Sequence, residues 1–184
     1  MFTRQDVCAL TGIPVAAFKT RARRDQLPTV NVPSQGATDE IRDRAKERGW
    51  NWFSPVDVLF IAVQERLMME IGYADGSSAA TAAKIVESNA GDIGRMYWLA
   101  SPTIGEPSPH DLWVGYLGYT DQGGRNSGGR NLGGDLVSVL GQLKADAEQQ
   151  KARLVLVNTS TVLRDIRNNA ARFNITFPVP ADWR

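Results

Sequence analysis

The sequence contains only one cysteine and one histidine, Cys8 and His110. A disulfide within the chain is therefore impossible, and a Cys/His zinc site would lack ligands. A Ser-His-Asp or Cys-His catalytic arrangement could use only His110, and the sequence offers no evident acid pair or metal cluster. We therefore expect no catalytic residues, no metal site and no cofactor, and an enzyme is the least favoured class.

Long hydrophobic runs are also missing. No stretch approaches the roughly 18 apolar residues of a membrane span. The first six residues include an acid and lack the apolar core of a signal peptide. Hydrophobic residues make up 42% of the chain and charged residues 22%, which is typical of a soluble globular protein. We therefore expect a cytoplasmic protein with no membrane partner.

A large excess of charge of either sign is absent too, because the formal net charge is only +1. The cations are nevertheless concentrated locally, since four of the six residues from Lys19 to Arg24 are Lys or Arg. A basic patch on a nearly neutral chain indicates one docking face, with the remaining surface free for other contacts.

The basic patch lies in the second of two predicted helices. Thr3 and Asp6 match a capping box that begins the first helix, and Gly12 can adopt the left-handed conformation that ends it. Pro14 stands where the second helix should begin. A helix, a glycine turn and a basic helix are typical of a helix-turn-helix, whose second helix enters the DNA major groove.

The second helix has two predicted faces. At about 100° per residue, Phe18 and Ala22 face the core, with Asp25 on the same side. The opposite side carries the cations and small residues, namely Ala16, Lys19, Thr20, Arg23 and Arg24, with Ala17 and Arg21 at its edge. This outward face is either an ordinary solvated surface or a DNA contact, and its lack of acids favours the second interpretation.

Two short strands, Val30–Val32 and Trp50–Phe53, are predicted next, with a charged helical insert, Asp39–Arg48, between them. Two strands after such a helix form a wing, which commonly touches the flanking minor groove or backbone. Trp50 and Trp52 share a face of their strand. They either pack against the helices or contact DNA.

A long helix follows, from Val56 to about Ile71, and it begins with a second capping box at Ser54 and Asp57. Because this helix is apolar on most sides, it must be covered on most sides, so we expect it to support the domain. Another helix is predicted over Ser78–Ser88.

The order of these segments resembles the MerR-type winged helix-turn-helix. The resemblance covers roughly residues 1–90, through Phe-Thr-x-x-Asp-Val-x-x-Leu-Thr-Gly-Ile, Phe-Lys, Leu-Pro, and Phe-Ser-Pro-x-Asp-Val-Leu-Phe before a helix ending in Ile-Gly-Tyr. It implies that the second helix reads the major groove, that the wing grips the backbone, and that dimers bind inverted repeats. Lys19 replaces a usual arginine, and Thr20 and Arg21 replace a usual aromatic pair.

The C-terminal half is predicted to be a separate α/β layer. A turn-rich connection, Ser101–Pro109, precedes a strand over Asp111–Tyr119. The segment Gly123–Gly134 repeats Gly-Gly-Arg-Asn and is interpreted as a flexible loop, or alternatively as an arginine-bearing arm that orders on nucleic acid. A helix from Leu136, a strand over Arg153–Asn158 buried on both faces, and a helix over Thr161–Phe173 follow, which suggests a right-handed crossover.

Together these features predict an α+β protein with a winged helix-turn-helix DNA-binding domain at residues 1–98 and an α/β dimerisation or partner-binding domain at residues 110–184. We expect a transcriptional regulator that binds double-stranded DNA and forms a homodimer through its C-terminal half. The alternatives are an excisionase-like or architectural DNA-binding protein and a winged-helix protein adaptor. The candidate DNA-binding residues are Thr3, Arg4, Ala16, Lys19, Thr20, Arg21, Arg23, Arg24, Arg48, Trp50 and Trp52.

Overall fold

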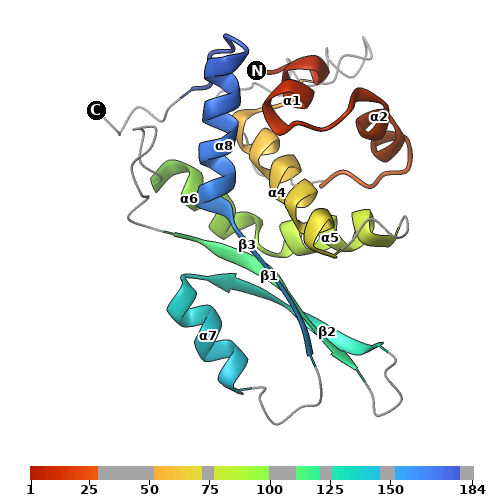
Figure 1. Ribbon diagram of the computed structural model, residues 1–184, viewed down its shortest axis with the longest axis vertical. Helices are drawn as coiled ribbons and strands as arrows, with labels where there is room; N and C mark the ends of the chain where they lie inside the picture. The colour runs from red at the N-terminus through yellow and green to blue at the C-terminus, as the bar shows by residue number, and fades with distance from the viewer. Residues whose placement is uncertain (29–51, 72–76, 100–110, 121–125, 146–151, 179–184) are drawn as a thin grey trace.

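The computed structural model describes the chain apart from residues 29–51, 72–76, 100–110, 121–125, 146–151 and 179–184. The described part contains seven helices and one three-stranded antiparallel sheet, so the expected α+β class is confirmed. In Figure 1, α7 lies on one side of the sheet and the other helices gather on the opposite side. The segment Ser101–Pro109 and His110 lie outside the described residues.

The first two helices are formed by local signals that the sequence displays. α1 (Arg4–Thr11) begins with a capping box between Thr3 and Asp6 and ends at Gly12, whose φ of 76° is left-handed. Glycine adopts this conformation without a Cβ clash, so the chain can turn sharply there. α2 (Val15–Arg23) follows with Pro14 at its N-cap. The two predicted helices are confirmed.

α4 (Pro55–Ile71) is the central helix of the fold. Its capping box is formed, because the backbone N–H of Ser54 donates to Asp57 Oδ2 at 2.7 Å and that of Asp57 donates to Ser54 Oγ at 3.1 Å. Ten of its residues are buried. The helix contacts α1, α5, α6, α8 and strand β3, which confirms that it is covered on most sides.

Two consecutive helices follow α4. α5 (Ser77–Ser88) confirms the prediction for this segment, whereas α6 (Ala90–Leu99) was not predicted. Asn89 stands between them, and its side-chain amide donates to the backbone oxygen of Ile85 at 2.9 Å. α6 contributes Ile93, Met96 and Tyr97 to the core.

The sheet has the strand order β2-β1-β3, with both neighbours antiparallel to the central strand. β1 (Trp113–Thr120) and β3 (Ala152–Asn158) lie where the sequence predicts strands. The expected right-handed crossover is wrong, because that connection joins parallel strands. The expectation that β3 is buried on both faces is also wrong, since β3 is an edge strand whose Leu154 is 43% exposed.

β2 (Asn126–Gly134) occupies most of the segment interpreted as a flexible loop, so that interpretation is wrong for these residues. Its glycines bring neighbouring groups close to the strand. A Cβ at Gly129 would lie 2.0 Å from the hydroxyl of Tyr116, and a Cβ at Gly133 would lie 2.1 Å from Asn89 Oδ1. These glycines therefore let the side chains of Tyr116 and Asn89 lie directly against β2.

The main hydrophobic core draws on both halves of the chain. It includes Leu10 and Leu67 from the N-terminal half together with Val155 and Ile166 from the C-terminal half. The last helix, α8 (Thr159–Arg172), packs against α1 and α4, as Figure 1 shows. The segments expected as two domains, residues 1–98 and 110–184, thus share one core.

α7 (Leu136–Ala145), which the sequence predicts, covers part of the opposite face of the sheet. It contributes Val139 to a second, smaller cluster with Leu117 and Leu132. Its outer side remains apolar, because Val137 is 80% exposed and Leu140 is 48% exposed.

Candidate nucleic-acid interface

α2 lies at the edge of the helical layer, away from α8 and from the sheet (Figure 1). Its outward side presents mostly the residues predicted for it, because Ala16, Lys19, Thr20, Arg23 and Arg24 are all exposed. No acidic residue occurs within the helix. The structure therefore leaves a cationic, acid-free helical face open to solvent.

The inward side of α2 differs from the prediction. Phe18 is fully buried, as expected, and its ring meets Phe53 edge-on at a centroid distance of 5.6 Å. Ala22, predicted to face the core, is exposed. Arg21, predicted as a DNA contact, is only 7% exposed and forms an ion pair with Glu65 of α4. Arg21 is thus not available to a duplex, because a buried carboxylate lies opposite it.

Two adjacent polar residues of α4 hold the C-terminal end of α2. Glu65 accepts a hydrogen bond from Arg21, while the Gln64 amide donates to the backbone oxygens of Gln26 and Ala79. The backbone N–H of Gln26 also donates to the backbone oxygen of Arg21 at 3.0 Å. We call Arg21, Gln26, Gln64 and Glu65 the polar clamp.

The polar clamp sets the orientation of α2 relative to α4, since buried polar groups hold one hydrogen-bonding geometry. Sequence reasoning missed Gln64 and Glu65. The available signal was the presence of a short polar run, Gln64–Arg66, within the otherwise apolar stretch Val58–Met68.

The N-terminus of α2 also differs from those of α1, α4, α7 and α8, which have side-chain caps. It has no side-chain cap and no acid in its first turn. At the start of α7, in contrast, the backbone N–H of Ser138 donates to Asp135 at 2.7 Å, and this bonding lowers the pKa of that carboxyl. Uncapped N–H groups and the helix dipole favour an anion, so a phosphate would suit the start of α2.

The remaining candidate DNA-binding residues differ in how far they are exposed to solvent. Thr3 is exposed, but its hydroxyl donates to Asp6 at 2.7 Å as part of the α1 cap. Arg4 is partly buried. Trp52 is 38% exposed, whereas Arg48 and Trp50 lie outside the described residues.

The predicted wing also lies mainly outside the described residues, including all of Val30–Val32. Phe53, the last residue of the second predicted strand, forms an isolated antiparallel bridge with Phe2. The described end of that strand is therefore tied to the start of the chain.

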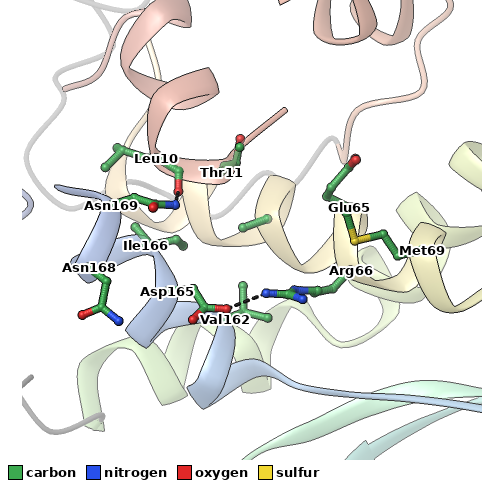
Figure 2. Close-up of a pocket in the computed structure, with 12 residues that line it drawn as sticks. Leu10, Thr11, Glu65, Arg66, Met69, Val162, Asp165, Ile166, Asn168 and Asn169 are labelled. Atoms are coloured by element: carbon green, nitrogen blue, oxygen red, sulfur yellow. Dashed lines mark hydrogen bonds and ion pairs between the residues drawn. The ribbon is translucent and has the colours of Figure 1, made fainter. Parts of the chain in front are cut away.

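A groove of about 370 Å³ lies behind the turn between α1 and α2, bounded by α1, α4 and α8 (Figure 2). Arg66 of α4 and Asp165 of α8 pair across it at 2.6 Å, with side chains 49% and 43% exposed. At its other end the side chain of Asn169 donates to the backbone oxygen of Leu10 at 2.9 Å. These bonds fasten α8 to α4 and to the end of α1.

Two further titratable side chains, those of Tyr97 and Cys8, are buried in the hydrophobic core. The hydroxyl of Tyr97 donates to the backbone oxygen of Pro178 at 2.9 Å, and burial raises its pKa to about 12 against the opposing effect of Arg167. Burial also raises the pKa of the Cys8 thiol, although Arg4 acts in the opposite direction. Within the described residues, no group of His, Cys, Asp and Glu side chains could hold a metal ion.

A search against family models finds none that matches this chain, and a search of curated proteins finds no significant relative. None of the described helices combines the length and apolar composition that crossing a bilayer requires.

Proposed function

We propose that this chain is a sequence-specific DNA-binding transcriptional regulator that inserts α2 into the major groove. The observation that carries this proposal is the exposed, acid-free cationic face of α2, supported from behind by Phe18 and the polar clamp. An α-helix with its side chains is about 10–12 Å in diameter, so α2 fits a major groove about 12 Å wide.

The proposed recognition residues are Lys19, Arg23 and Arg24. Lysine and arginine donate to guanine N7 and O6, and each good contact is worth about 1–3 kcal/mol of discrimination. Contacts to phosphates would add affinity that falls steeply with salt. The uncapped N-terminus of α2 supports such a phosphate contact.

We further propose the MerR-like winged form for the N-terminal half, with residues from the 29–51 segment as the wing. Binding as a homodimer to an inverted repeat through the C-terminal half is part of the same proposal. The exposed apolar side chains of α7 support dimerisation there. The proposed location is the cytoplasm.

Selection of bound sequences from random duplexes, followed by gel-shift titration, tests the proposal. Arg23→Ala and Arg24→Ala should each weaken binding to the selected site by about tenfold or more, while thermal unfolding stays unchanged. Arg95→Ala is the matched control, because Arg95 is an exposed arginine on α6, away from α2.

Unchanged affinity in both α2 variants would reject α2 as the recognition helix. Absence of any DNA binding at low salt would instead favour the adaptor alternative. Tight binding with strong bending but no sequence preference would favour the architectural one.

A further inference from the structure

The exposed face of α2 has a second part that the cations do not explain, and its interpretation rests on the proposed function. Val15, the first residue of α2, is 43% exposed, and the next residue, Ala16, is exposed as well. Thr20 lies one turn further along the same face. Its hydroxyl donates to the backbone oxygen of Ala16 at 2.9 Å, so the hydroxyl proton is already used and the side chain offers its methyl beside a hydroxyl that can only accept. We call Val15, Ala16 and the Thr20 methyl the methyl patch.

The methyl patch is flanked by cations at helical spacing. Lys19 follows Val15 by four residues, and Arg23 follows Lys19 by four, so the three side chains share one face. One helical turn rises about 5.4 Å, whereas successive base pairs are about 3.4 Å apart. Groups one turn apart on α2 therefore face base pairs that are no more than about two steps apart.

A single exposed valine is normal on a protein surface. Three apolar groups beside two cations, in contrast, match two features that base edges present in the major groove. In the major groove the apolar group that base edges present is the thymine C5-methyl, and guanine presents two acceptors. We infer that the methyl patch reads a thymine methyl, and that Lys19 or Arg23 reads a guanine within about two base pairs of it.

The test removes one methyl group from the DNA. In the site obtained by selection, each thymine is replaced in turn by deoxyuridine, which pairs identically but lacks the methyl. We expect one such replacement to lower wild-type affinity about fourfold, the value of one buried methyl group. Val15→Ala or Thr20→Ser should lower affinity for the thymine site similarly and abolish the difference between thymine and deoxyuridine.

Both substitutions preserve the helix, because Val15 is exposed and serine retains the hydroxyl that bonds to Ala16. Thr161→Ser on α8 is the matched control for Thr20→Ser, since it removes the same methyl group from an exposed threonine distant from α2 and should keep the fourfold preference.

Three results would overturn the inference while leaving the proposed function intact. They are a selected site without a thymine near a guanine, deoxyuridine that is neutral at every position, and variants that retain full sensitivity to the methyl. Failure to select any site would reject the proposed function itself.

Discussion

Arg21 and Glu65 form an ion pair that joins α2 to α4. Helical periodicity placed Arg21 at the edge of the outward face, yet its side chain is buried against a carboxylate 44 residues away in sequence. Arg21 follows Phe18 by three residues, and Ala22 follows it by four, so either could have completed the inward stripe. Because Glu65 of α4 is buried opposite Arg21, Arg21 faces inward and Ala22 is exposed.

Glu65→Gln should lower the free energy of unfolding by about 3–5 kcal/mol, because it leaves the Arg21 guanidinium buried without its counter-charge. Urea denaturation measures this change. The double variant Arg21→Met with Glu65→Met should recover much of the loss, since it removes both charges and retains apolar volume. A Glu65→Gln protein as stable as wild type would show that the pair is not buried in solution.

Tyr97 should make the protein sensitive to alkaline pH. Its folded-state pKa of about 12 exceeds the ordinary value of 10.0, so its neutral form is favoured by folding. The resulting stability is fully present below pH 10 and is lost as the pH rises through the folded-state pKa. It amounts to about 2–3 kcal/mol, from the size of the shift.

Tyr97→Phe removes this titration and also the hydrogen bond to Pro178. Chemical denaturation at pH 9 and pH 11.5 should therefore show a smaller decline in stability for the variant than for wild type. Identical pH profiles would contradict the assignment, since other tyrosines titrate equally in both proteins.

At the scale of elements, helices with capping signals were predictable and the glycine-rich strand was not. The caps of α1 and α4 involve residues three positions apart, so the sequence displays both partners together. β2 has little intrinsic strand preference because six of its nine residues are glycine or asparagine, and both residue types are depleted in strands. The segment forms a strand because it pairs with β1 and contacts Asn89.

Gly115→Ala tests the close approach of β1 and β3. An added Cβ would lie 1.9 Å from the backbone oxygen of Val155, which cannot move aside without disturbing the strand pairing. We expect a loss of about 2–3 kcal/mol in the free energy of unfolding, measured by thermal or urea denaturation.

Gly141→Ala is its control. This glycine is exposed on α7, and an added Cβ meets nothing within 4 Å. Since alanine is the better helix former, the control should be neutral or stabilised by up to about 1 kcal/mol. Equal effects at the two positions would show that the packing at Gly115 is not the cause.

At the scale of the whole molecule, the C-terminal segment packs against α1 and α4. Phe177 stacks on Phe2 at 5.5 Å between ring centroids and meets Tyr97 edge-on at 6.3 Å. Asn169 and Asp165 join α8 to α1 and α4. The two helices that contact α2 are therefore themselves held by residues of the C-terminal half.

The proposed dimer should depend on the outer side of α7. Val137→Glu places a charge on a side chain that is 80% exposed, so the fold should be retained while an apolar interface would be disrupted. Analytical ultracentrifugation should show a dimer for wild type and a monomer for this variant.

Met69→Glu, the same kind of change at a residue that is 50% exposed on α4, should remain dimeric. If the Val137→Glu protein were still a dimer, the dimer interface would not lie on α7.

The amino-acid sequence by itself determined where α1, α2, α4, α7 and α8 lie, because caps and apolar periodicity act between neighbours within a turn or two. Tertiary structure alone decided the antiparallel order of the strands, the conversion of a glycine-rich segment into β2, the burial of Arg21 and the shared core. Each of these depends on a partner distant in the chain, whose position exists only after the helices and strands have packed together.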